Sequence, residues 1–138
     1  MNQLTVKHNA LTAEEFVTLW ESVWDGAPSL EQTRLALEHT LFRVSVFAGD
    51  EIIAMARMIG DMGLNYYVKD VVVKPAYQKK GVGKLLMGEL MQFVQDHGVK
   101  GTDIFVELCA MPDKMPFYEK LGFDTNEAQR LKRMVHVD

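Results

Sequence analysis

Hydrophobic residues in the first third of the chain follow a helical spacing. Leu4-Thr5-Val6 alternates as a short strand, and Thr12 then begins a helix with acidic residues in its first turn. Five apolar residues recur at steps of three and four along this helix: Phe16, Leu19, Trp20, Val23 and Trp24. The segment Asp25-Gly26-Ala27-Pro28 ends it, and Ser29 caps a second helix whose apolar pattern is weaker.

From residue 43 onward the period changes to the alternation of β-strands. Strands over 43–48 and 52–58 are joined at Gly49-Asp50, which predicts a hairpin. A turn at 60–63 leads to a third strand over 66–73, which ends at Lys74-Pro75. The consecutive valines Val71, Val72 and Val73 predict burial on both faces at the far end of this strand.

The last third of the chain adds a crossover and closing elements. A helix over 83–97 ends at Gly98, a predicted left-handed cap, and a strand over 102–109 follows. A helix between two strands favours their parallel pairing. Pro116 begins a short helix that Gly122 ends, and 130–137 predicts a closing strand. The chain is therefore predicted to be one α+β domain over 1–138, with a mixed, mostly antiparallel central sheet flanked by helices.

Composition and charge limit which partners the protein is expected to bind and in which compartment it is expected to work. The 138 residues are 48% hydrophobic and 25% charged with net charge −4, as in an ordinary globular domain. Scattered basic residues predict no nucleic-acid partner. A lone Cys109 fits a reducing compartment, and no stretch is long and apolar enough to span a membrane, so the cytoplasm is expected. Isolated histidines predict no metal site, and exposed strand edges are compatible with a homodimer.

The segment Gln78-Lys79-Lys80-Gly81-Val82-Gly83 joins the valine-rich strand directly to a helix. The first turn of a helix has unpaired N–H groups and the positive end of the dipole, and glycines let a phosphate approach the backbone. A P-loop would need Gly at 78, and a dinucleotide fingerprint would need Gly at 86, where the chain has Leu86. An anion site remains, and a plain strand-to-helix turn without a ligand stays open beside it.

Two motifs resemble those of one family. The segment 70–86 resembles the coenzyme-binding motif Gln/Arg-x-x-Gly-x-Gly/Ala of the GCN5-related N-acetyltransferases (GNAT), which follows a valine-rich strand. Downstream, the segment 117–123 matches the family's Phe-Tyr-x-Lys-x-Gly-Phe pattern. The two motifs stand in the family's order and spacing, so the chain is identified as similar to GNAT N-acetyltransferases and is expected to have their acyl-CoA N-acyltransferase fold.

The resemblance implies acetyl-CoA as co-substrate, without a metal. In the family, the strand matching Val71, Val72 and Val73 splays from the one matching 105–109, and the coenzyme enters the resulting cleft. Backbone groups of Val71 and Val73 are then expected to contact the pantetheine arm and the acyl carbonyl. The pyrophosphate is expected at the amides of Gln78, Lys79, Lys80, Gly81, Val82, Gly83 and Lys84.

Amide formation from a thioester needs donors for the oxyanion and a proton for the departing thiolate. We predict that the Val73 amide serves the oxyanion, since a bulge or splay leaves strand amides unpaired. We predict Tyr118 as the proton donor and as a coenzyme contact, because a phenol with a pKa near 10 is protonated at neutral pH. The general base is left unassigned among Asp70, Glu107 and Asp113, and a chain of waters is an alternative.

The acceptor is expected to be a primary amine of a small molecule. Two alternatives stay open: a non-catalytic acyl-CoA-binding or sensor domain, and a protein N-acetyltransferase. The first helices, which shape the acceptor site in the family, do not identify the amine. Met111 stands where the family often has an Asn that binds pantetheine, so this contact is lost or is supplied by backbone.

Overall fold

The computed structural model describes residues 3–125, 133–134 and 136–138. They divide into two compact units, 1–108 and 109–138, whose positions relative to one another are not determined. The first unit contains, in order, β1 (Leu4–His8), α1 (Ala13–Glu21), α2 (Leu30–Glu38), β2 (Phe42–Ala48), β3 (Glu51–Gly60), β4 (Asn65–Val73), the 3₁₀ turn η1 (Pro75–Tyr77), α3 (Val82–His97) and β5 (Phe105–Leu108).

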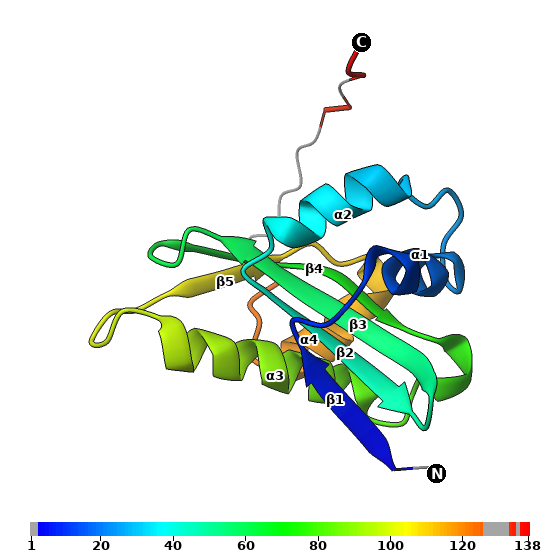
Figure 1. Cartoon of the computed structure of the whole chain (residues 1–138). Coiled ribbons are helices and arrows are strands. Elements are labelled where there is room, and N and C mark those ends of the chain that lie inside the picture. The colour runs from blue at the N-terminus through cyan, green and yellow to red at the C-terminus, as the bar shows by residue number, and fades with distance from the viewer. Residues whose placement is uncertain (1–2, 126–132, 135) are drawn as a thin grey trace. The chain divides into compact units, whose positions relative to one another are not determined.

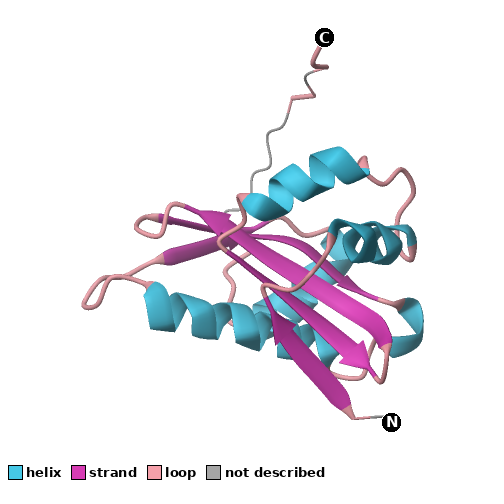
Figure 2. Cartoon of the chain, in the orientation of Figure 1, coloured by secondary structure: helices cyan, strands magenta, loops and turns pink. Residues whose placement is uncertain are grey.

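The sheet of the first unit has the strand order β1-β2-β3-β4-β5. The first four strands pair antiparallel and β5 pairs parallel with β4. Helices α1 and α2 cover one face of this sheet and α3 covers the other (Figure 1; Figure 2). The predicted mixed, mostly antiparallel sheet flanked by helices is confirmed, and the parallel pair follows from the α3 crossover.

Each face of the sheet has its own apolar packing. Phe16 and Leu19 of α1 and Leu37 of α2 pack with Met55 and Val72 of the sheet. On the other face, Phe42 of β2 stacks on Phe93 of α3 with ring centroids 4.7 Å apart. The buried positions of α3 recur at helical spacing, and they are Val82, Leu86, Met87, Leu90 and Phe93.

Local sequence signals set the helix starts as predicted. The Thr12 amide donates to Glu15 Oε1 at 2.9 Å and the Glu15 amide donates to Thr12 Oγ1 at 3.1 Å, a complete capping box. The end of α1 differs, because the helix stops at Glu21 and Trp24 lies beyond it, 43% exposed. The Ser22 hydroxyl donates to the Leu19 carbonyl at 2.6 Å, and this bond competes with continuation of the helix.

The predicted turn at 60–63 is built around one carboxylate. Asp61 Oδ1 accepts from the amides of Gly63, Leu64 and Asn65 at 3.0, 2.8 and 2.9 Å. These hydrogen bonds, with that from Asn65 first, hold the pKa of Asp61 well below its usual range. The turn thereby fixes where β4 begins.

Two predictions about the strands are wrong in detail. Of the three valines only Val72 is buried, whereas Val71 and Val73 are half-buried, so this end of β4 is not covered on both faces. β5 is shorter than predicted. It pairs with residues 65–68 of β4 and not with the valines, as the resemblance to the GNAT family implies. Among the described residues, no strand pairs with β4 on the β5 side beyond Val68.

Gly98 is not the predicted left-handed cap. Its φ is −65° and its ψ is 158°, an extended conformation that any residue adopts. Glycine is needed there for space, because a Cβ would lie 2.8 Å from the Val94 carbonyl oxygen and 2.7 Å from Ile104 Cδ1.

Gly98→Ala is therefore expected to lower the free energy of unfolding by about 1–3 kcal/mol, because Cβ overlaps a backbone oxygen that cannot move away. Gly88→Ala is the matched control within α3, since nothing lies within 4 Å of its Cβ. It is expected to raise stability by about 0.5–1 kcal/mol. Urea denaturation measures both, and equal effects of the two variants would contradict the packing argument.

The second unit contains the 3₁₀ turn η2 (Pro112–Lys114) and α4 (Met115–Lys120). Pro116 stands in the first turn of α4, and Gly122 beyond its end has φ +95°, as expected for a helix stop. Cys109, the single cysteine, is exposed. Half of the predicted closing strand over 130–137 lies outside the described residues, and the described residues 133, 134, 136 and 137 are not in a strand.

Candidate functional site

β4 contains a bulge just before its valines. Met55 of β3 pairs with Val72, and Arg57 pairs with Lys69, so β4 has one extra residue between these two pairs. Asp70, in this stretch, has φ +54°, the left-handed conformation that one type of bulge usually gives to glycine. The bulge therefore changes the course of the strand where Val71 begins.

The backbone of β4 after the bulge directs alternate amides away from β3. The Lys74 amide donates to the Ile53 carbonyl of β3 at 2.8 Å. Successive residues of a strand point their N–H groups to opposite sides of the strand. The amides of Val73 and Val71 therefore point away from β3, on the opposite side from the Lys74 amide. The last β4–β5 pair is Val68 with Leu108, and no described strand pairs with this edge of β4 beyond it. The Val73 amide thus points to an edge where β4 and β5 have separated.

The turn between β4 and α3 is an exposed loop with two left-handed residues. Lys79 has φ +62° and Gly81, the N-cap of α3, has φ +87°. Gly81 has no side chain to bond the first amides of this 16-residue helix, and the helix has no acidic residue in its first turn. Lys79, Lys80 and Lys84 are all exposed around it. Free amides, a helix dipole and three cations make this turn suited to an anion.

Gln78 connects the turn to the strand. Its side-chain amide Nε2 donates to the Val73 carbonyl oxygen at 3.0 Å. The start of the turn is thereby held against the strand end whose amide points to the open edge. Val71, Val72, Val73 and the whole segment 78–84 lie in the first unit, and Val82 is buried.

Tyr118 lies in α4 of the second unit. Its ring contacts Phe117 and Phe123 edge-on, with centroids 5.0 and 5.9 Å away. Burial raises the pKa of the Tyr118 phenol above its ordinary value of 10.0, so the group is protonated at neutral pH. This is the protonation state that a proton donor needs.

The three carboxylates considered as general base differ in environment. Asp70 Oδ2 accepts from Arg57 Nε at 2.6 Å, and the two side chains are 11% and 15% exposed. One oxygen of the Asp70 carboxylate is therefore engaged by Arg57. Glu107 on β5 and Asp113 in η2 are exposed. Arg57 was not singled out from the sequence, since a single Arg in a strand carries no local signal for a partner 13 residues away.

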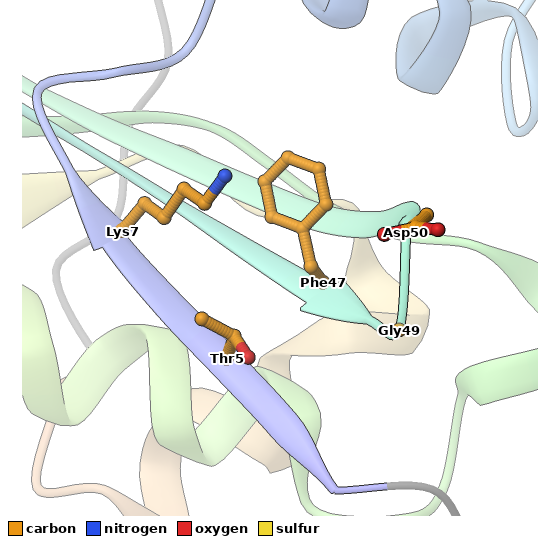
Figure 3. Close-up of a pocket in the computed structure, with 5 residues that line it drawn as sticks. All are labelled: Thr5, Lys7, Phe47, Gly49 and Asp50. Carbon is orange, nitrogen blue, oxygen red and sulfur yellow. The ribbon is translucent and has the colours of Figure 1, made fainter.

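A pocket of about 300 Å³ lies elsewhere in the first unit, beside the β2–β3 turn. Figure 3 shows its lining residues, with the Lys7 side chain extended toward the Phe47 ring, whose centroid is 4.2 Å from Lys7 Nζ. None of the predicted site residues lines it. Within the described residues, no group of three His, Cys, Asp or Glu side chains is placed to hold a metal ion, and no helix is long and apolar enough to cross a membrane.

Comparison with known proteins identifies the family of this site. The sequence model of the acetyltransferase (GNAT) family matches residues 9–123. The chain belongs to the GNAT family. That match includes the bulge, the turn before α3 and the segment containing Tyr118, so the predicted family and fold class are confirmed.

Relatives of this GNAT chain have names of the same kind. The uncharacterized N-acetyltransferase ycf52 of Porphyra purpurea is 32% identical over 114 residues, which cover 79% of this chain and 63% of that protein. Serotonin N-acetyltransferase 2, chloroplastic, of Oryza sativa subsp. japonica is 34% identical over 104 residues, 71% of this chain and 50% of that protein. The chain thus spans between half and two thirds of the length of these relatives.

A solved structure gives the same GNAT fold over nearly the whole chain. A protein of unknown function from meticillin-resistant Staphylococcus aureus, described as a probable acetyltransferase, superposes with a TM-score of 0.84 and 25% identity. The superposition covers 98% of this chain and 100% of the other.

Proposed function

We propose that this chain transfers the acetyl group of acetyl-CoA to a primary amine of a small molecule by direct attack of the amine on the thioester. The observation that carries the proposal is the bulged end of β4, which no described strand pairs with on the β5 side beyond Val68, joined to the turn before α3. The Val73 amide points away from β3 at that end, and the turn supplies cations and the first amides of α3. Together they offer a binding surface for both the acyl end and the pyrophosphate of acetyl-CoA.

The steps follow from these groups. The α3 amides and the lysines of the turn bind the pyrophosphate, and the Val73 amide donates to the carbonyl oxygen of the thioester. As the neutral amine attacks the carbonyl carbon, that oxygen gains negative charge, which the amide stabilises in the transition state. The intermediate collapses with cleavage of the C–S bond, and the Tyr118 phenol donates its proton to the departing thiolate. A water takes the proton released from the amine.

Support for a small acceptor comes from a relative's name. The rice protein is named for serotonin, a primary amine with an aromatic body. In this chain Trp20 and Trp24, whose ring centroids are 4.8 Å apart, lie at the end of α1 and in the segment that leads to α2. An aromatic amine is therefore our first choice among small acceptors.

An acceptor screen tests the proposal. The purified chain with acetyl-CoA is offered arylalkylamines including serotonin, then amino sugars, polyamines, amino acids, aminoglycosides and peptides with free amines. We expect thiol release that depends on a small amine, with the acetylated product identified by mass spectrometry. Coenzyme binding with no acetylated amine in any class would favour the sensor alternative, and acetylated peptides alone would favour a protein acetyltransferase.

A further inference from the structure

The Arg57–Asp70 pair is a shielded ion pair at the bulge. Arg57 Nε lies 2.6 Å from Asp70 Oδ2, and the side chains are 15% and 11% exposed. A second pair of equal length, Arg34 with Glu14, is 55% and 60% exposed. Exposed ion pairs contribute little to stability because water and salt screen them. Removing one partner of a shielded pair is strongly destabilising, because the other charge is left buried and unpaired.

Asp70 holds an unfavourable backbone conformation in the same place. Its φ of +54° lies in the left-handed region, which residues with a Cβ adopt at an energetic cost. This conformation is part of the bulge between the Lys69–Arg57 and Val72–Met55 pairs. The side chain that the ion pair restrains therefore belongs to the very residue whose backbone turns the strand.

Arg57 also contacts the helical layer through a second nitrogen atom, Nη1. Arg57 Nη1 donates to Thr40 Oγ1 at 3.2 Å, and this hydroxyl in turn donates to the Ala36 carbonyl of α2 at 2.8 Å. The hydroxyl's own proton is committed to α2, so its lone pairs accept from Arg57. The guanidinium thus joins the C-terminal end of α2 to the bulge of β4.

We propose that Arg57 and Asp70 are positioning residues, which hold the β4 bulge in its left-handed conformation and thereby aim the amides of Val71 and Val73 at the acyl carbonyl. This inference rests on the proposed function for its kinetic test, but the backbone geometry that it explains does not. Neither residue touches the reacting atoms, so the pair acts on the rate through the orientation of the amides.

Variants of residue 70 separate backbone conformation from side-chain charge. Glycine adopts φ +54° without cost, so Asp70→Gly keeps the bulge without the carboxylate, whereas alanine does not. We expect Asp70→Ala to lower kcat at least about tenfold with KM for acetyl-CoA within about twofold, and Asp70→Gly to stay within about threefold of wild type in kcat. Asp70→Asn, which tolerates this conformation and still accepts from Arg57, is expected to behave like Asp70→Gly.

The double variants remove the buried unpaired charge from the comparison. Arg57→Met alone leaves the Asp70 carboxylate without its partner charge. The double variants have no unpaired charge at this place, and they are Arg57→Met/Asp70→Ala and Arg57→Met/Asp70→Gly. We expect the glycine double variant to exceed the alanine one in kcat by about tenfold, since only glycine relieves the backbone. Arg34→Met, which removes the exposed pair of equal length, is expected to leave kcat within about twofold of wild type.

Amide resonances test the same inference without turnover. In ¹H–¹⁵N spectra, we expect the Val73 amide shift, and its response to added coenzyme A, to be retained in Asp70→Gly and changed in Asp70→Ala. Equal kinetic losses for glycine and alanine, or an unchanged Val73 resonance in Asp70→Ala, would overturn the positioning role. Wild-type protein that acetylates no amine would instead contradict the proposed function, and the spectra would still decide the role of the pair.

Discussion

Replacing Tyr118 by phenylalanine is expected to lower kcat for acetyl transfer about 100-fold or more, because it removes the proton donor for the thiolate. The affinity for coenzyme A is expected to stay within about twofold, since the ring and its contacts with Phe117 and Phe123 are preserved. Steady-state kinetics at saturating acetyl-CoA measure kcat, and calorimetric titration with coenzyme A measures the affinity.

Tyr66→Phe is the matched control for the loss of a tyrosine hydroxyl. The Tyr66 side chain is buried in β4 and its hydroxyl donates to the Met62 carbonyl at 3.1 Å. This variant is expected to lose about 1 kcal/mol of stability with little change in kcat. A Tyr118→Phe enzyme as active as Tyr66→Phe would rule out Tyr118 as the proton donor.

The pH dependence of kcat gives a further check on Tyr118. Only the protonated phenol can donate, and burial raises the pKa of Tyr118 above 10.0. Because this pKa is raised, the phenol loses its proton at a higher pH than a free tyrosine does. Deprotonation of Tyr118 is therefore expected to lower kcat only above about pH 10. A Tyr118-dependent fall in the wild-type kcat profile between pH 7 and 9, absent in Tyr118→Phe, would contradict this assignment.

Gly81→Ala is expected to raise Kd for coenzyme A about tenfold or more. Gly81 has φ +87°, and a residue with a Cβ either bears a cost of about 1–2 kcal/mol or changes the turn. A changed turn moves the first amides of α3 away from the positions that we propose to bind the pyrophosphate. Calorimetric titration measures the affinity and urea denaturation measures the stability.

Gly49→Ala is the matched control for this conformational cost. Gly49 has φ +61° in the β2–β3 turn, and nothing lies within 4 Å of its Cβ, as at Gly81. The two variants are expected to lose similar stability, but only Gly81→Ala is expected to lose coenzyme affinity. Equal affinities in the two variants would exclude the α3 turn as the pyrophosphate site.

Interactions between near neighbours in the chain were predictable from the sequence. The capping box of Thr12 and Glu15, the hairpin turn at Gly49 and the glycine N-cap of α3 depend on residues within a few positions of one another. The parallel pairing of β5 also followed, because a helix between two strands leaves room for that direction. Family membership was predictable for the same reason, since both of its motifs are continuous segments.

The tertiary structure alone decided the features that depend on distant partners. Whether Val73 is covered depends on where β5 ends, and Gly98 is needed because Ile104 approaches it. The partner of Arg57 lies across a strand pair whose register a bulge shifts. The sequence by itself therefore predicted the turn that we propose to bind an anion and the residues that we propose for the chemistry. Only the fold decided the aim of the Val73 amide, because strand register and the bulge are set by packing between segments rather than within one.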